Sequence, residues 1–407
     1  MMTAGKNTMA PRVVGSEHGT DLLLQFANSI RLGDKMKGYY LFAPVEAENA
    51  GPGSGVERKV RSQCKALNQY LNCELVILPP VEYTGSPAEK IRRRLPFTAA
   101  WRKWKYRGEF NDADFLYIRQ VYHDASFVRY LRAIRRQNPK VKIIYEVPTY
   151  PYDQQTSWTV SSAPFRIKER VNRRLVAKVV DRIITFYGQK EIWGVPCFPL
   201  MNGFDFSSVS LSPRTLTKQI HIVSVAQTAF WHGYQYMIEG LRDYYASDGV
   251  ENIIYHMVGN ALPEHVQIVE RYHLQDHVVF HGRQAGPALY DIYNSCCLGL
   301  NVLGVPADGN PKSSSLKSRE YAALGLPIVS SLPIDFLPED YPYLCVLPAV
   351  NEPVNVAQIV RFYHKVYDQT DPNAVAASIR AFSIDRCDMS VTMKPVVDWL
   401  RDTGERK

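Results

Sequence analysis

Short apolar runs alternate with longer amphipathic stretches along most of this chain. In the first half, apolar runs predict strands at 38–43, 74–78, 114–119, 142–147 and 182–186, and 3.6-residue periodicity predicts helices at 56–71, 127–136 and 166–180. The alternation restarts with predicted strands at 219–225, 252–258, 277–281, 298–303 and 327–330, and predicted helices at 234–245, 263–272, 287–294, 354–367 and 391–401. Strands and helices alternating at this spacing are typical of parallel sheets that are covered on both faces.

Two such series in a chain of 407 residues predict an α/β protein with two doubly wound, Rossmann-like domains facing across a cleft. The expected division is a loose N-terminal extension (1–37), an N-terminal domain (38–205), a linker (206–218) and a C-terminal domain (219–389). A last helix at about 390–402 is expected to pack back on the N-terminal domain. Ligands of such sheets bind beyond the carboxyl ends of the strands, so the cleft is the expected site.

Composition places the chain among globular proteins, because 46% of its residues are hydrophobic. No apolar run is long enough to span a membrane, and the first residues lack the apolar core of a signal peptide. The seven cysteines form no CxxC pair and no His/Cys metal-ligand spacing, which favours a reducing compartment. The expected location is therefore cytoplasmic, with peripheral contact to the inner face of the membrane as an option.

The net charge of +8 is concentrated in two stretches. Eight basic residues lie in Lys90–Arg107, interleaved with Phe97, Trp101 and Trp104, and seven lie in Arg166–Arg182. Three interpretations stay open: contact with an anionic membrane surface, binding to nucleic acid, or a solvated helix face. The chain offers no nucleic-acid recognition motif, so nucleic acid is not an expected partner.

One short segment carries the most specific chemistry. Ser313 to Ser315 offer N-caps for a helix that ends at Gly325, and an apolar strand follows. Glu320 lies inside this helix, where a carboxylate can accept hydrogen bonds from the two hydroxyls of a ribose. The helix start directs N–H groups and partial positive charge at a diphosphate. The alternative is an ordinary helix with a solvated glutamate.

The second half resembles the nucleotide-sugar domain of the GT-B glycosyltransferases, specifically the retaining family 4 of bacterial polysaccharide biosynthesis. Five segments match that pattern in order: 199–205 (PLMNGFD), 223–234, 255–260 (YHMVGN), 279–282 (VFHG) and 315–329 (SLKSREYAALGLPIV). The glycine-rich loop at 51–55 is similar to the first glycine-rich loop of the family.

The resemblance implies a role for each matching residue. Glu320 matches the carboxylate that accepts the ribose hydroxyls. Donors toward the sugar nucleotide are expected from Ser314, Ser315, Leu316, Lys317, His232, Gly53, Gly55 and Gly259. The chain departs from the family at two places: Lys312 replaces a second glutamate, and Gln227 or Thr228 and His232 stand where a basic pair is usual. Lys317 can replace the missing charge or form an i,i+3 salt bridge with Glu320. For His232, the alternative is a solvent-facing turn residue.

On the acceptor side, Arg119 and Glu146 end two predicted strands where relatives carry histidines, and both are candidate catalytic residues together with Lys317. The alternative is that Arg119 and Glu146 pair with each other across neighbouring strands. Transfer with retention is implied by the resemblance, without a named nucleophile, metal or other cofactor.

We therefore expect a sugar-nucleotide-dependent glycosyltransferase that acts on a glycan or lipid-linked saccharide in surface or exopolysaccharide biosynthesis. The alternatives are a catalytically inactive GT-B subunit of a glycosyltransferase complex and a nucleic-acid-binding protein.

Overall fold

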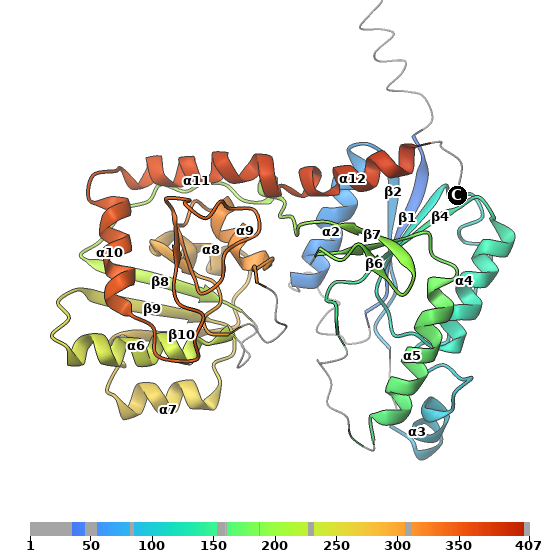
Figure 1. Cartoon of the computed structure of the whole chain (residues 1–407), viewed down its shortest axis with the longest axis horizontal. Helices are drawn as coiled ribbons and strands as arrows, with labels where there is room; N and C mark the ends of the chain where they lie inside the picture. The colour runs from blue at the N-terminus through green and yellow to red at the C-terminus, as the bar shows by residue number, and fades with distance from the viewer. Residues whose placement is uncertain are drawn as a thin grey trace, which may run out of the picture.

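The chain folds around two parallel β-sheets, one in each half (Figure 1). The computed structural model describes residues 35–44, 55–81, 85–152, 159, 161–186, 188–226, 232–305 and 311–402. The predicted extension 1–37 lies almost wholly outside these residues. The α/β class with two doubly wound domains is confirmed, and the carboxyl ends of two sets of strands are available to build a site.

The N-terminal sheet has the strand order β2-β1-β3-β4-β5-β7-β6, with only β6 antiparallel to its neighbour. Its strands are β1 (Lys37–Phe42), β2 (Asn72–Ile77), β3 (Phe115–Arg119), β4 (Lys142–Glu146), β5 (Arg182–Thr185), β6 (Glu191–Ile192) and β7 (Val195–Pro199). Its helices are α2 (Gly55–Asn68), α3 (Pro87–Arg94), α4 (Ala125–Gln137) and α5 (Ala163–Ala177). Both faces of the strands carry buried apolar side chains, as a covered parallel sheet requires.

The C-terminal sheet has the strand order β10-β9-β8-β11-β12-β13, all parallel. Its strands are β8 (Gln219–Val225), β9 (Asn252–Val258), β10 (Val278–Gly282), β11 (Leu298–Leu300), β12 (Ile328–Ser330) and β13 (Leu344–Val346). The helices after β8 are α6 (Tyr234–Ala246), α7 (Pro263–Arg271), α8 (Gly286–Ser295), α9 (Leu316–Ala323), α10 (Val356–Tyr367), α11 (Pro372–Cys387) and α12 (Met389–Arg401).

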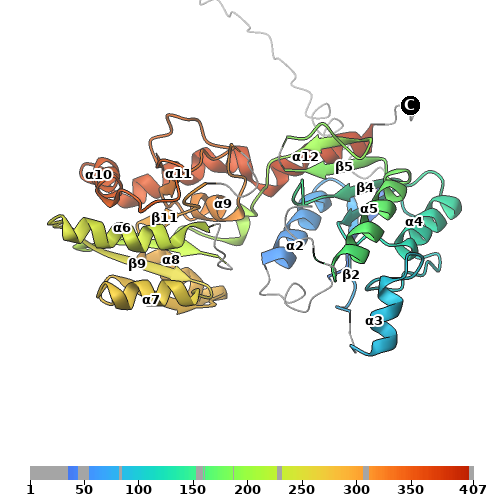
Figure 2. The same ribbon diagram turned by 60° about the horizontal axis from the view of Figure 1, so that its bottom comes forward.

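The last two helices follow one another along one side of the molecule, α11 beside the C-terminal sheet and α12 beside the N-terminal sheet (Figures 1 and 2). Met389, Met393, Val396, Val397 and Leu400 of α12 are buried in one apolar cluster with α2 and the N-terminal strands. The end of the chain therefore completes the core of the first domain.

The chain crosses between the two sheets twice, and the two crossings are hydrogen-bonded to each other. Phe204 N donates to Cys387 O at 2.9 Å, and Met389 N donates to Phe204 O at 2.8 Å. A Cβ added at Gly203 would lie 2.3 Å from Thr392 Oγ1 and 2.9 Å from Met389 Cα, so the close approach of the two segments requires glycine here. Residues 202–206 and 387–389 thus form one joint.

Some elements were not predicted. These are α3, β6, β7, β13 and α11. The two-residue β6 is too short to give a periodic signal, and α11 (PNAVAASIRAFSIDRC) mixes alanine with scattered polar residues so that no single apolar stripe marks it. Among the described residues, no helix is both long and apolar enough to cross a membrane.

Candidate functional site

The start of α9 is fixed to the carboxyl ends of two strands. Ser315 is the N-cap residue: its hydroxyl accepts from Ser318 N and donates to Asn301 Oδ1 at 2.6 Å, just past β11. The Asn301 amide donates to Ser313 Oγ at 3.1 Å and to Ser330 Oγ, at the end of β12, at 3.2 Å. This side-chain network holds the helix start rigidly where nucleotide ligands bind in doubly wound sheets.

Glu320 faces the opposite domain. It is buried, and its Oε1 lies 3.7 Å from Nη1 of Arg58 on α2, so this ion pair bridges the two domains. Within the described part of the chain, Glu320 Oε1 and the hydroxyl of Tyr293 have no hydrogen-bond partner. Burial raises the pKa of Glu320, while Arg58 opposes that rise. A buried acceptor oxygen without a donor is suited to a hydroxyl supplied by a ligand.

Lys317 lies one turn before Glu320 but does not pair with it. Its Nζ donates to the hydroxyl of Tyr234 at 3.0 Å, and burial lowers the pKa of Lys317 to about 7. The ring of His232 stacks on Tyr234 with centroids 5.3 Å apart. Burial, with the Lys317 charge, lowers the pKa of His232 to about 3, so this imidazole is neutral at physiological pH. The salt-bridge alternative for Lys317 is wrong, whereas His232 is half-buried and its role stays a prediction.

The turn before α6 needs the glycine that follows His232. Gly233 has a φ of 68°, and a Cβ there would lie 2.1 Å from Leu303 O. This close approach also aligns Leu303 N to donate to His232 O at 2.9 Å. The glycine therefore holds His232 beside Lys317.

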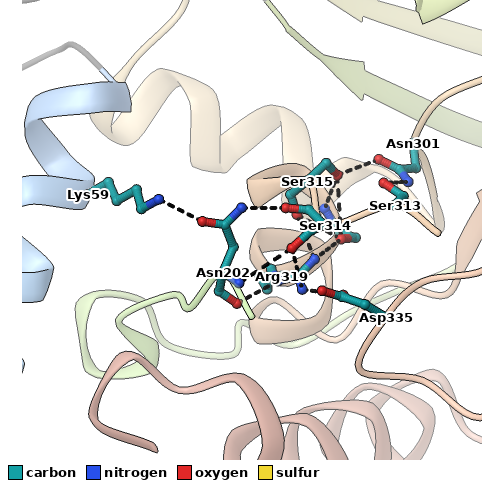
Figure 3. Close-up of polar contacts among 9 residues, drawn as sticks. Lys59, Asn202, Asn301, Ser313, Ser314, Ser315, Arg319 and Asp335 are labelled. Carbon is teal, nitrogen blue, oxygen red and sulfur yellow. Dashed lines mark hydrogen bonds and ion pairs between the residues drawn. The ribbon is translucent and has the colours of Figure 1, made fainter. Parts of the chain in front are cut away.

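A second buried network joins α9 to the interdomain joint and to α2 (Figure 3). Asn202 Oδ1 accepts from Lys59 Nζ at 2.6 Å, and Asn202 Nδ2 donates to Ser314 O at 2.6 Å. Arg319, with no exposed surface, donates through Nε to Asn202 O at 2.8 Å and pairs through Nη2 with Asp335. Asn202 thus contacts both domains with one side chain.

Lys59 extends this network into the N-terminal domain. Its Nζ lies 3.6 Å from Glu146 Oε1 and 3.7 Å from the centroid of the Phe186 ring. Burial lowers the pKa of Lys59 to about 8, although the Glu146 charge opposes the change. The shift follows from placing an ammonium group in the protein interior.

Glu146 is fully buried at the end of β4 and is saturated with partners. It pairs with Arg119 and accepts from Tyr117 and from Gln63, the latter at 2.7 Å. Burial alone would raise the pKa of Glu146, but Lys59, Arg119 and these hydrogen bonds outweigh it and hold the pKa below its ordinary value. The alternative that Arg119 and Glu146 pair across neighbouring strands is thereby confirmed. Their catalytic role stays a prediction, and the structure does not bring them into contact with Lys317 or Glu320.

The other residues that the sequence analysis named lie at separate places in the fold. Gly53, Gln227 and Thr228 lie outside the described residues. Gly55 is the exposed first residue of α2, and Gly259 N donates to Gly282 O at 2.7 Å beyond the end of β9. Lys312, where the family pattern has a glutamate, is exposed. In the ranges that the structure describes, no group of three or more His, Cys, Asp or Glu residues is placed to hold a metal ion.

Sequence reasoning missed Lys59 and Asp335, and it quoted Arg58, Asn202 and Arg319 only as parts of motifs. The spacing of Lys59 and Gln63, one turn apart on α2, was the available signal, because both are polar and lie on its buried face. Arg319 has hydrogen-bond partners that are distant in the sequence, and no local pattern identifies them.

This arrangement of two facing Rossmann-like domains, with the helix that carries Glu320 at their junction, is the GT-B fold of glycosyltransferases. HepE from Anabaena in complex with UDP is similar over 90% of this chain and 99% of its own, with a TM-score of 0.56 and 13% identity. A glycosyltransferase from Rickettsia africae is similar over 91% and 100%, with a TM-score of 0.57 and 9% identity.

Sucrose-phosphate synthase from Thermosynechococcus elongatus is also similar, over 89% of this chain and 99% of its own, with a TM-score of 0.56 and 13% identity. The sequence matches no protein-family model and no curated protein. At these identities the likeness establishes the fold, and the retaining family 4 assignment stays a prediction.

Proposed function

We propose that this protein is a glycosyltransferase that moves a sugar from a nucleoside-diphosphate sugar to a saccharide acceptor. The observation that carries the proposal is the buried Glu320 carboxylate, whose Oε1 accepts no hydrogen bond from the described residues and faces the Arg58 guanidinium at 3.7 Å. It lies one turn from Lys317 on α9, whose N-cap Ser315 is hydrogen-bonded to Asn301 just past the end of β11. A ribose on Glu320 would place the diphosphate toward the start of this helix, where backbone N–H groups and Lys317 favour negative charge.

The chemistry follows from where charge develops. The bond between the anomeric carbon and the diphosphate oxygen breaks, and that oxygen takes the bonding electrons. The acceptor hydroxyl bonds to the anomeric carbon, and its proton passes to the leaving phosphate. Donors already aimed at the leaving oxygen lower the barrier because they need no reorganisation. We assign this task to the Ser314, Ser315 and Leu316 amides, to Lys317 and to a neutral His232, which supplies one N–H. Gly53, Gly55 and Gly259 remain candidates for further contacts to the sugar nucleotide.

Retention of anomeric configuration is part of the proposal, as is an acceptor that is a glycan or a lipid-linked saccharide of surface or exopolysaccharide biosynthesis. The UDP bound to the similar HepE structure supports uridine nucleotides as the first donors to test. We propose no metal and no further cofactor, since the donor groups around α9 can neutralise the leaving diphosphate.

The first test is Glu320→Gln with calorimetry of UDP binding. We expect binding to weaken by about 1–3 kcal/mol, because a charged acceptor of the ribose hydroxyls is lost. We also expect folding stability to be equal or higher at neutral pH, since burial raises the pKa of Glu320 and its ionised form is therefore disfavoured in the fold.

Glu264→Gln is the matched control, because Glu264 is exposed on α7 of the same domain. It should leave UDP affinity and stability unchanged. Unaltered UDP affinity in Glu320→Gln, with the variant folded, would refute the ribose site.

A second candidate is a GT-B subunit that has lost catalysis. The exposed Lys312 favours it, because the family pattern places a glutamate there, near the sugar ring. Release of UDP from a panel of radiolabelled UDP-sugars, with and without saccharide acceptors, separates the two. An enzyme turns over at least one donor, whereas an inactive subunit binds UDP and releases no sugar from any.

A further inference from the structure

Large apolar side chains are exposed together at one end of the N-terminal domain. Ile91 and Leu95, four residues apart at the end of α3, are 63% and 50% exposed, and Phe97 just beyond is 80% exposed. On α5, Ile167 and Val171 are also four residues apart, and both are more than half exposed. Residues at i and i+4 of a helix lie on one face, so Ile167 and Val171 form an apolar stripe on α5. Ile91 of α3 and Leu95, the C-cap residue that follows this helix, form a second exposed apolar stripe.

Buried polar contacts join the two helices. Lys168 of α5 is buried, and its Nζ donates to Arg93 O at 2.6 Å and to Thr98 O at 3.2 Å. The Arg93 guanidinium lies 3.5 Å from the centroid of the Trp101 ring, which in turn stacks on Phe165. A buried cation with this many partners fixes α3 on α5, so the exposed stripes belong to one preformed surface.

Exposed cations accompany the apolar stripes. Lys90, Arg92 and Arg94 of α3 are all exposed, and no acidic residue occurs between Lys90 and Arg107. Glu89 of the same helix lies 3.8 Å from Arg92 and offsets one of these charges. On α5, Glu169 is held by His123, Tyr152 and Arg173, so its charge is committed within the domain. The surface is therefore apolar with a basic border.

We propose that this α3–α5 surface docks the protein on an anionic lipid membrane. An anionic leaflet matches both features, because its headgroups attract the cations and its acyl boundary accepts Phe97 and the aliphatic stripes. Nucleic acid would offer phosphates to the cations and leave Ile91, Leu95, Ile167 and Val171 in water. The exposed apolar side chains inside the basic border thus favour lipid over nucleic acid.

The position of the surface deepens the proposed function. Both α3, which follows β2, and α5, which follows β4, come after the carboxyl ends of their strands, and in both views α3 lies at the end of the domain away from α12 (Figures 1 and 2). A lipid-linked acceptor held at this surface would approach the N-terminal domain, in which Arg119 and Glu146 end β3 and β4. Only the nature of the acceptor rests on the proposed function, since the docking surface depends on its own residues.

The test is flotation of the full chain with vesicles of phosphatidylcholine alone or with 30 mol% phosphatidylglycerol. The two variants are Lys90→Gln/Arg92→Gln/Arg94→Gln and Phe97→Ser. Arg93 is left intact, because it is buried over Trp101 and a change there would disturb packing. Each variant has a matched control in the other domain at exposed positions, Arg271→Gln/Arg283→Gln/Arg386→Gln and Val250→Ser.

We expect the wild-type chain to float with anionic vesicles and not with neutral ones. The triple variant should reduce partitioning about 100-fold, since each basic residue contributes to attraction by the leaflet, and Phe97→Ser should reduce it about tenfold. The controls should behave as wild type. The proposal is wrong if the wild-type chain does not bind anionic vesicles, if it binds neutral vesicles equally well, or if both variants bind as the wild type does. It is also wrong if DNA protects the surface and the chain binds no vesicles.

Calorimetry with UDP on the same proteins keeps the two proposals apart. Vesicle binding without UDP binding would leave the docking surface in place and refute the donor site. UDP binding without vesicle binding would support the donor site and refute the docking surface.

Discussion

Three charged residues within four positions of α9 have three different surroundings. Lys317 contacts Tyr234, Arg319 is sealed in the interior with Asp335, and Glu320 faces Arg58 across the domain junction. The sequence pattern was sufficient to select Glu320 and Lys317 as candidates. It could not assign Arg319, because its partners Asn202 and Asp335 are brought near only by the fold. Local patterns identify chemistry, while burial and long-range partners determine which charges remain available.

At Lys317 we predict that donor affinity depends on pH. Burial lowers the pKa of Lys317 to about 7 in the free protein, and a bound diphosphate should raise it because the ammonium form is favoured. Binding therefore takes up a proton above pH 7. Affinity for a nucleoside-diphosphate sugar should be highest below pH 7 and fall by up to about tenfold per pH unit above it. Calorimetry from pH 6 to pH 9 measures the slope.

Lys317→Arg is the control for this pH dependence. Arginine keeps the positive charge throughout the range, so the slope should disappear while binding at low pH is retained. His232 does not contribute to the slope, because its pKa of about 3 leaves it neutral throughout. A wild-type slope that persists in Lys317→Arg would show that another group titrates.

At the scale of elements, strong periodicity made most strands and helices predictable within one or two residues. β1, β3 and β4 contain continuous apolar runs, as central parallel strands do, and β8 (QIHIVSV) and β9 (NIIYHMV) are mostly apolar with isolated His or Ser residues inside. Elements with weak or short patterns escaped: α11 lacks a clear stripe, and β7 contains Pro196 and Pro199, which are typical of edges and ends of strands. Such elements are specified by the neighbours they pack against, and a single sequence does not show these contacts.

For α12 we predict that its inner face stabilises the N-terminal domain. Leu400 is 1% exposed within the cluster shared with α2 and the N-terminal strands, so Leu400→Ala should lower the free energy of unfolding by about 2–5 kcal/mol. Val391 is exposed on the same helix, and Val391→Ala should change it by no more than about 0.5 kcal/mol.

Urea unfolding followed by tryptophan fluorescence measures the free energy of unfolding of both variants. Trp399 of α12 packs against Phe198 with ring centroids 5.7 Å apart, and apart from Trp231 the other tryptophans precede residue 200. Equal effects of the two substitutions would mean that α12 does not belong to the N-terminal core.

At the scale of the whole molecule, the two domains are joined by more than their covalent crossings. Arg58 pairs with Glu320, Lys59 bonds to Asn202, and Lys65 bonds to Asp205 at 2.7 Å, and all three residues belong to α2. α2 therefore carries one face toward the N-terminal sheet and one toward the joint and α9. A ligand bound to Glu320 contacts the same carboxylate that pairs with Arg58 of the other domain. Donor binding and the relative position of the two domains are therefore physically linked.

Among these three residues of α2, we expect substitution of Lys59 to reduce stability most. Its side chain is 6% exposed and is one of two cations beside the fully buried Glu146. Lys59→Met would leave that carboxylate with Arg119 as its one neighbouring cation among the described residues, beside the hydrogen bonds from Tyr117 and Gln63. We therefore expect a loss of about 1–3 kcal/mol in the unfolding transition seen by the tryptophans. Lys65→Met, on the same helix but with a side chain that is 56% exposed, should lose about 1 kcal/mol or less.

The interdomain share of this loss can be separated with a double-mutant cycle of Lys59→Met and Asn202→Ala. Asn202→Ala removes the acceptor of Lys59 and the donor to Ser314 O, so it should also weaken UDP binding by loosening the start of α9. A coupling energy of about 1–3 kcal/mol between the two substitutions would show that Lys59 acts through Asn202. Additive effects would mean that Lys59 serves Glu146 only, and that α2 and α9 are held together by the Arg58–Glu320 pair and the hydrogen-bonded joint instead.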